Sequence, residues 1–192
     1  MKNIYPISIG CDCDQDRKNF YHGSESKDKL SWNGIEIGIP AFRKKRKIFF
    51  EEFGIWVKIT WFVRADIQIQ MVYGDAGYCL KRFSKLWHTL EEEGDEVAWH
   101  PHLWDWDDKY QKWYQKIGDA EFTHRCLNLG YERFVKSWGK PPVTVHAGWC
   151  YQDDLSMTCL SELGLLADCS ALPGYNTLGT GTYDQADWSG AP

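Results

Sequence analysis

Short apolar runs alternate with longer amphipathic stretches along most of this chain. Runs rich in β-branched and aromatic residues predict buried strands, because such side chains pack well on a pleated surface. The predicted strands cover residues 4–10, 55–63, 96–99, 143–145 and 165–167. Apolar residues at helical spacing predict helices over residues 41–52, 77–93, 110–138 and 153–163. Strands that alternate with helices favour parallel βα units, and hence an α/β fold.

Polar residues of chemical interest gather at the carboxyl ends of these strands. They are Asp12, Asp14, His100, His102, His146 and Asp168. In a βα barrel these ends form one face, and the active site lies there. Their shared position therefore predicts a (β/α) barrel with one site built from several strands.

The sequence His100-Pro101-His102 is the main candidate for metal binding. Side chains two apart on an extended backbone point to the same side, and Pro101 disfavours a helix at His100. Two neutral imidazoles hold a divalent metal when a carboxylate joins them, and Asp14 is the expected carboxylate. A packed, hydrogen-bonded loop is the alternative for an isolated pair, and the acidic run 12–16 weakens it.

Such a site leaves a coordination position for water, whose pKa the metal lowers. Asp12 shares a face with Asp14, so it is a candidate general base, or a residue that holds a histidine in its metal-binding tautomer. His146 is a candidate acid or oxyanion donor, with a packed histidine under a loop as the alternative.

Three further residues are candidates for substrate binding: Trp104, Trp149 and Asp168. Sugar rings present C–H faces to aromatic rings, so the two tryptophans could form a saccharide platform, with core packing as the alternative for each.

The composition narrows the function classes. A length of 192 residues with 43% hydrophobic residues favours one domain, residues 1–192, with a sizeable core. A net charge of −5 argues against a nucleic-acid partner. The basic run 43–47 is interpreted as the solvated face of an amphipathic helix.

The seven cysteines form no CxxC pair, and no apolar run is long enough for a signal peptide or a membrane span. Free thiols in a cytoplasmic protein are the simplest interpretation. The oligomeric state stays open, with a homo-oligomer as one option.

Four segments give the chain a resemblance to NodB-homology polysaccharide deacetylases, a carbohydrate-esterase-type family. Residues 9–14 and 94–100 resemble the first two motifs of the family, and residues 145–149 and 167–170 are weaker matches to the next two. The element His-Pro-His-Leu at 100–103 is similar to a subgroup often encoded among surface-polysaccharide genes. The correspondence covers about residues 4–174.

This resemblance implies a distorted βα barrel that binds a divalent metal, most simply zinc. It implies Asp12 as the base, Asp14 as a metal ligand, and two metal-binding histidines from the second motif. The implied activity is removal of acetyl from an N-acetylated sugar during surface-polysaccharide (O-antigen or capsule) biosynthesis, by attack of metal-activated water on the amide carbonyl.

Three departures from the family pattern are visible. Trp104 stands four residues after His100, where the second histidine is usual, so His102 is expected as the ligand. His146 stands where the family has an arginine that orients the base. The late Leu-x-His motif that supplies the acid is absent, since no histidine follows His146. We therefore expect either a barrel incomplete at its C-terminus or a relative whose activity is lost or altered. A saccharide-binding or scaffold protein, and another C–N hydrolase on a related barrel, are the alternative functions.

Overall fold

Five parallel strands form the sheet that organises this protein. A computed structural model of the chain describes residues 7–16 and 27–172. The strands are β1 (Gly10–Cys13), β2 (Thr60–Arg64), β3 (Glu96–His100), β6 (Thr144–Val145) and β7 (Ala167–Asp168), in the order β1-β2-β3-β6-β7. All four pairings are parallel, which confirms the predicted α/β fold.

The predicted barrel is not confirmed, because the sheet does not close within the described residues. Strands β1 and β7 form its two edges. The predicted strand 4–10 begins outside the described part of the chain, and β1 starts only at Gly10.

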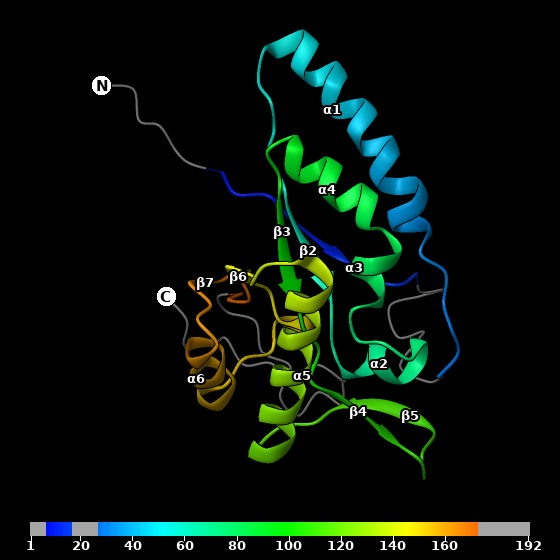
Figure 1. Cartoon of the computed structure of the whole chain (residues 1–192), viewed down its shortest axis with the longest axis vertical. Helices are drawn as coiled ribbons and strands as arrows, with labels where there is room; N and C mark the ends of the chain where they lie inside the picture. The colour runs from blue at the N-terminus through cyan, green and yellow to red at the C-terminus, as the bar shows by residue number, and fades with distance from the viewer. Residues whose placement is uncertain (1–6, 17–26, 173–192) are drawn as a thin grey trace.

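Six α-helices accompany the sheet in the described segments, and Figure 1 shows their arrangement. They are α1 (Ile39–Phe53), α2 (Ile67–Tyr73), α3 (Tyr78–Arg82), α4 (Ser84–Glu92), α5 (Ala120–Trp138) and α6 (Asp154–Glu162). A short π-helical segment, Gly34–Gly38, precedes α1, and a 3₁₀ turn, Gly148–Cys150, follows β6. None of the described helices is long and apolar enough to cross a bilayer.

The helix prediction over 110–138 is wrong for its first third. An antiparallel hairpin of β4 (Trp104–Asp107) and β5 (Lys112–Gln115) replaces it. The Asp107 carboxylate accepts backbone hydrogen bonds from Lys109 (2.8 Å) and Tyr110 (3.0 Å), which fixes a turn in place of a helix. Helix α5 begins only at Ala120, where the Asp119 side chain caps it.

Helix α5 approaches the sheet closely at Gly130. A Cβ at this position would lie 2.5 Å from the Ala65 carbonyl oxygen and 2.8 Å from the Trp99 ring. Gly130 therefore lies inside α5 as a packing residue and does not interrupt the helix. The indole N–H of Trp99 donates to the same Ala65 carbonyl at 2.8 Å, so the core has no unpaired polar group at this contact.

The basic run in α1 is only partly solvated. Arg46 is 3% exposed, and its guanidinium lies 2.6 Å from the Asp95 carboxylate. Asp95 also accepts from the Trp61 indole (2.9 Å) and the Ile59 amide (3.1 Å), so the buried charges are paired and hydrogen-bonded. Arg46 therefore anchors α1 on the sheet, whereas the neighbouring lysines are exposed.

Candidate metal centre

The ends of three strands, together with the loop that follows β3, bring the predicted site residues together. Asp12 lies within β1 and Asp14 directly follows it, His100 ends β3, and His146 directly follows β6. The register aligns Arg64 with His100 across β2 and β3, which keeps these carboxyl ends level.

The sheet is strongly curved where these residues meet. Strands β2 and β3 separate β1 from β6, so a flat sheet would hold β1 and β6 about 14 Å apart. The Asp12 Oδ1 and His146 Nδ1 atoms are nevertheless 3.0 Å apart. The curvature folds the carboxyl ends toward one another, as in the expected barrel, although the sheet stays open.

Asp14, His100 and His102 place three potential ligand atoms within 4.8 Å of one another. The two Nε2 atoms of the histidines are 3.1 Å apart. Asp14 Oδ2 lies 3.9 Å from Nε2 of His100, and Asp14 Oδ1 lies 3.8 Å from Nε2 of His102. Both histidines are buried and Asp14 is half-buried. Two imidazole nitrogens and one carboxylate are a donor set that zinc accepts.

A backbone carbonyl determines the tautomer of His100. Nδ1 of His100 lies 2.5 Å from the His146 carbonyl oxygen. A carbonyl can only accept, so Nδ1 donates to it, and Nε2 is the atom of His100 that faces His102 and Asp14. A carbonyl that orients a histidine in this way is the usual outer support of a metal ligand. The residues present therefore fit a divalent metal.

A second group, formed by Asp12, His100 and His146, also places one potential ligand atom of each residue within 4.8 Å of the others. In that group His100 would have to use Nδ1, which lies 3.8 Å from Asp12 but is already hydrogen-bonded to the His146 carbonyl. The hydrogen-bonding pattern thus favours Asp14, His100 and His102.

Gly148 is a site residue that the sequence did not reveal. Its amide donates to the Pro101 carbonyl at 2.8 Å, which ties the β6 loop to the His100–His102 segment. A Cβ on Gly148 would lie 2.2 Å from the His102 ring. A larger residue here would displace that imidazole.

Arg64 is a second residue that sequence inspection missed. It ends β2, is fully buried, and its Nη1 lies 2.7 Å from Asp14 Oδ1. Its other nitrogens bond Asp66 and Gln68. Burial alone would lower the pKa of Arg64, but the Asp66 and Asp14 carboxylates raise it well above its ordinary value. Arg64 therefore stays cationic and fixes the orientation of the Asp14 carboxylate.

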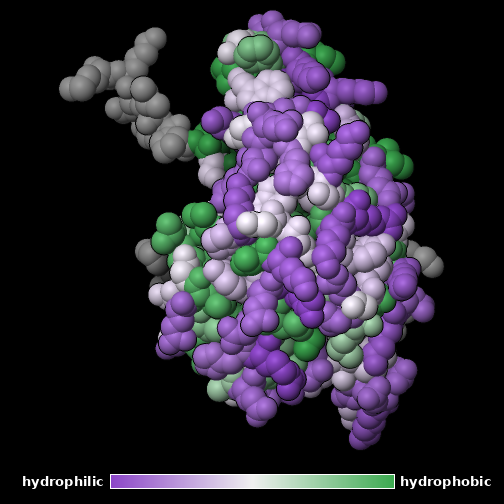
Figure 2. Space-filling model, in the orientation of Figure 1, coloured by the Kyte–Doolittle hydropathy of each residue, from purple (hydrophilic) through white to green (hydrophobic). Residues whose placement is uncertain are grey.

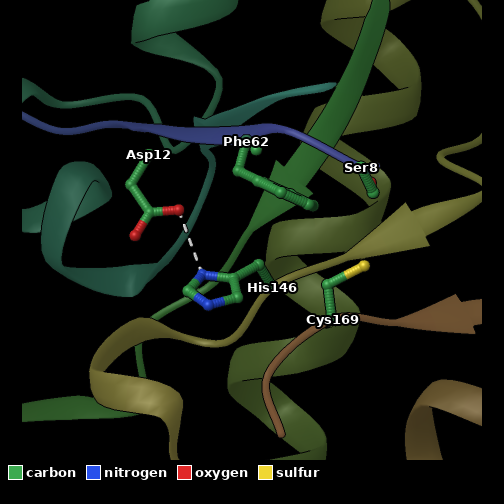
Figure 3. A pocket seen from close by; sticks show the side chains of 6 residues that line it. Ser8, Asp12, Phe62, His146 and Cys169 are labelled. Atoms are coloured by element: carbon green, nitrogen blue, oxygen red, sulfur yellow. Dashed lines mark ion pairs between the residues drawn. The ribbon is translucent and has the colours of Figure 1, made fainter. Parts of the chain in front are cut away.

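Asp12 and His146 form an ion pair at the mouth of the site (Figure 3). Burial opposes the charged form of His146, yet its hydrogen bonds to Asp12 and Cys150 raise the pKa of the imidazole to about 10. Burial likewise tends to raise the pKa of Asp12, and the fields of His100 and His146 outweigh it and lower that pKa. Near neutral pH the Asp12 carboxylate is therefore negatively charged and the His146 imidazole positively charged.

The ion pair opens into a cavity of about 410 Å³ beside the edge of the sheet. The residues that line it are Ser8, Gly10, Asp12, Phe62, His146 and Cys169 (Figure 3). This volume suits a small polar ligand and gives Asp12 and His146 access to it.

The three predicted substrate residues lie in different environments. Trp104 is 2% exposed and stacks on Trp149, with ring centroids 5.9 Å apart, so it presents no open face to a sugar. Trp149 is half-buried and adopts a left-handed backbone with φ of 60°. Asp168 accepts from the amide and hydroxyl of Ser170, and the same hydroxyl accepts from the Ala147 amide at 2.7 Å. Asp168 thereby supports the loop next to His146.

Comparisons with known proteins found likeness in structure only. No protein-family model and no curated protein sequence matches the chain. A structure from Mycobacterium smegmatis, assigned as a polysaccharide deacetylase, aligns with 86% of this chain and 50% of its own at 18% identity and a TM-score of 0.47. A family 4 carbohydrate esterase from Streptomyces lividans aligns over 84% and 60% at 12% identity and a TM-score of 0.46.

The peptidoglycan deacetylase PdaC from Bacillus subtilis aligns over 83% of this chain and 55% of its own, at 13% identity and a TM-score of 0.42. The chain thus spans between 50% and 60% of the length of these three structures. Likeness at this level carries no weight in assigning a function or site residues.

Proposed function

We propose that this protein is a metal-dependent deacetylase that removes acetyl from an N-acetylated sugar. The observation that carries the proposal is the convergence of Asp14, His100 and His102, with Nδ1 of His100 held by the His146 carbonyl and its Nε2 directed at the other two ligands. The similarity of residues 9–14 and 94–100 to deacetylase motifs supplies the substrate class.

Each residue has a defined part in this proposal. A divalent metal, with zinc as the proposed ion, would be held by Asp14, His100 and His102 and would polarise the acetyl carbonyl and acidify a water molecule. Asp12 accepts the proton of the attacking water, because its carboxylate is ionised and faces the cavity. His146 carries a proton at neutral pH, as a general acid or oxyanion donor requires.

The cellular context is part of the proposal and rests on the His-Pro-His-Leu element alone. We propose that the protein acts in surface-polysaccharide assembly, in the cytoplasm, on a saccharide substrate. We also propose that residues 1–192 form a single domain. Trp149 and Asp168 are kept as candidate substrate contacts, and Trp104 is not, because its ring is buried.

A catalytically degenerate saccharide-binding protein is the second candidate. Arg64 supplies a buried cationic partner to Asp14, which partly satisfies the carboxylate without a metal.

Metal analysis combined with an acetate-release assay separates the two candidates. Purified protein incubated with zinc and desalted should retain about one zinc per chain and should release acetate from N-acetylglucosamine oligomers. His102→Ala should lose both, whereas His124→Ala, on α5 and outside the site, should lose neither. Zinc-free wild type without acetate release would favour the binding protein.

A further inference from the structure

Two thiols lie next to each other on β1, and the proposed function uses neither. Cys11 and Cys13 are two residues apart, so their side chains point to the same face of the strand. Asp12, between them, and Asp14, after them, point to the opposite face, toward the candidate metal centre. Strand β1 thus carries a pair of thiols on one face and the site carboxylates on the other.

The two thiols are in contact. The Cys13 thiol donates to the Cys11 carbonyl oxygen at 3.6 Å, which directs the Cys13 sulfur back along the strand. A side-chain hydrogen bond from Cys13 lowers the pKa of the Cys11 thiol, although burial and the Asp12 carboxylate oppose that shift. Cys11 is exposed and Cys13 is buried. An accessible thiol with a second thiol beside it is the usual arrangement of a peroxide-sensitive cysteine pair.

A disulfide between these residues requires a change in β1. Residues two apart on a strand have Cα atoms about 6.4–6.8 Å apart, whereas bridged cysteines usually have Cα atoms about 4.4–6.8 Å apart and Cβ atoms about 3.5–4.5 Å apart. The extended spacing lies at the long end of this range. Strand β1 must therefore shorten around Asp12 when the bond forms, and a bond of this kind is easily reduced again.

Strand β1 can shorten because it is an edge strand within the described residues. It pairs with β2 alone, and Figure 1 shows the blue strand β1 beside β2. The residues that lead into β1 lie on the surface, since Ile7 and Ile9 are 85% and 42% exposed. Figure 2 shows hydrophobic side chains at the surface beside the grey trace that precedes this segment. A change in β1 therefore disturbs one strand pairing only.

We propose that Cys11 and Cys13 form a reversible disulfide, which displaces Asp12 and Asp14 and so switches the candidate metal centre off. Asp12 would move away from His146, whose Nδ1 atom now lies 3.0 Å from its carboxylate. Asp14 would move away from Arg64, whose Nη1 atom lies 2.7 Å from its carboxylate. The effect on metal binding rests on the proposed function, whereas the formation of the bond does not.

Hydrogen peroxide is the oxidant in this proposal. The Cys11 thiolate attacks one peroxide oxygen, the O–O bond breaks, and a sulfenic acid forms while the departing hydroxide takes up a proton and becomes water. The Cys13 sulfur then attacks the Cys11 sulfur, the S–S bond forms, and the hydroxyl group leaves with the Cys13 proton as a second water. The two thiols lose two electrons in total, and one peroxide gains them. Dithiothreitol reverses the reaction by two successive thiol–disulfide exchanges.

Peptide mass spectrometry of the folded full chain tests whether the bond forms. Trypsin releases residues 3–17, a peptide whose only cysteines are Cys11 and Cys13. After peroxide treatment and alkylation, this peptide should carry no alkyl group and should lack two hydrogen atoms, and dithiothreitol should restore it. Cys11→Ser should prevent this change. Cys13→Ser should leave a sulfenic acid on Cys11, which dimedone traps.

Zinc retention by the same samples tests the switch. Oxidised wild type should retain at least about tenfold less zinc than reduced wild type, because the support of a metal ligand is disturbed. Cys11→Ser changes an exposed side chain, so it should fold normally and retain zinc whether or not peroxide is added. Cys169→Ser removes another exposed thiol and should respond to peroxide as wild type does.

Three results would decide against parts of this proposal. A peptide 3–17 that is still fully alkylated after peroxide treatment overturns it, as does a bond from Cys13 to the nearby Cys79 or to a second chain. A Cys11–Cys13 bond that leaves zinc retention unchanged overturns the switch. Reduced wild type that binds no zinc contradicts the proposed function instead, and the peptide mass then still decides whether the bond forms.

Discussion

At the scale of single residues, the site depends on groups that support the candidate ligands. His100, His102, Asp12 and Asp14 could be named from the sequence because an HxH pair and a DxD run have characteristic spacings. Arg64 and Gly148 could not, since one contacts Asp14 across 50 residues and the other acts through a missing side chain. Neither belongs to a local pattern.

Gly148→Ala should weaken metal binding while leaving the fold intact. The new Cβ would collide with the His102 ring, and no positive φ at Gly148 adds backbone strain. Zinc affinity measured by calorimetry should fall about tenfold or more, as expected when the support of a ligand is disturbed. Gly38→Ala, whose Cβ meets nothing closer than 4.0 Å, is the control. Unchanged affinity in Gly148→Ala would show that His102 does not bind the metal.

Arg64→Ala should destabilise the protein strongly. Removing this buried cation leaves the Asp66 and Asp14 carboxylates without their partner, and breaking a buried ion pair costs about 3–5 kcal/mol. Urea unfolding followed by circular dichroism measures the loss. Arg125→Ala, on the exposed side of α5, should change stability by less than about 0.5 kcal/mol. A comparable small change in Arg64→Ala would contradict a structural role for the Arg64 pairs.

The Asp12–His146 pair predicts a pH-dependent contribution to stability. The pKa of His146 is raised to about 10, above that of an unfolded histidine near 6.5. Its stabilisation is therefore fully present below about pH 6.5 and is lost as the pH rises through about 10. The free energy of unfolding of wild type should exceed that of His146→Gln at pH 6.5, and the two should converge by about pH 10. If the difference in the free energy of unfolding between wild type and His146→Gln stayed constant from pH 6.5 to about 10, the ion pair would not contribute to stability.

At the scale of elements, the sequence predicted the central strands and the longer helices but missed the hairpin. Strand β3 and helix α6 fall within two residues of their predicted bounds, because apolar runs and stop signals dominate there. The hairpin was missed because its turn depends on the Asp107 side chain and on Gln111 at φ 49°, neither of which alters the hydrophobic pattern. The short α2 was missed because it spans only seven residues.

Gly130→Ala tests how closely α5 must approach the sheet. The added methyl group would overlap the Ala65 carbonyl and the Trp99 ring, and overpacking of this kind costs about 1–3 kcal/mol. Thermal unfolding should therefore shift downward, although alanine favours helix more than glycine does. Asn128→Ala, exposed on the same helix, should leave the transition unchanged or raise it slightly. A rise in the Gly130→Ala transition would mean that α5 can move away from the sheet at little cost.

At the scale of the whole molecule, the sequence indicated a distorted (β/α) barrel, with an incomplete C-terminal part as one option, and the described residues form an open, curved sheet. Strand ends and polar residues could be read locally, whereas closure of a sheet depends on pairing between its two edge strands, which within the described residues are β1 and β7. The hydrophobic pattern of a sequence predicts local elements and does not indicate which edge strands pair. Grouping the polar residues by strand end still predicted that Asp12, Asp14, His100, His102 and His146 lie together, whereas Asp168 bonds Ser170 instead.

The curvature of this open sheet has a mechanical consequence. Asp12 and His146 touch only because the sheet bends, and each sits on a different side of the bend. Their attraction therefore holds the two sides of the concave face together, because the described residues do not form the continuous ring of strand pairing that makes a closed barrel rigid. Mild flattening would part the two side chains while every strand stayed paired. The pKa of His146, which depends on its contact with Asp12, should therefore fall when the sheet flattens, before spectroscopy shows any unfolding.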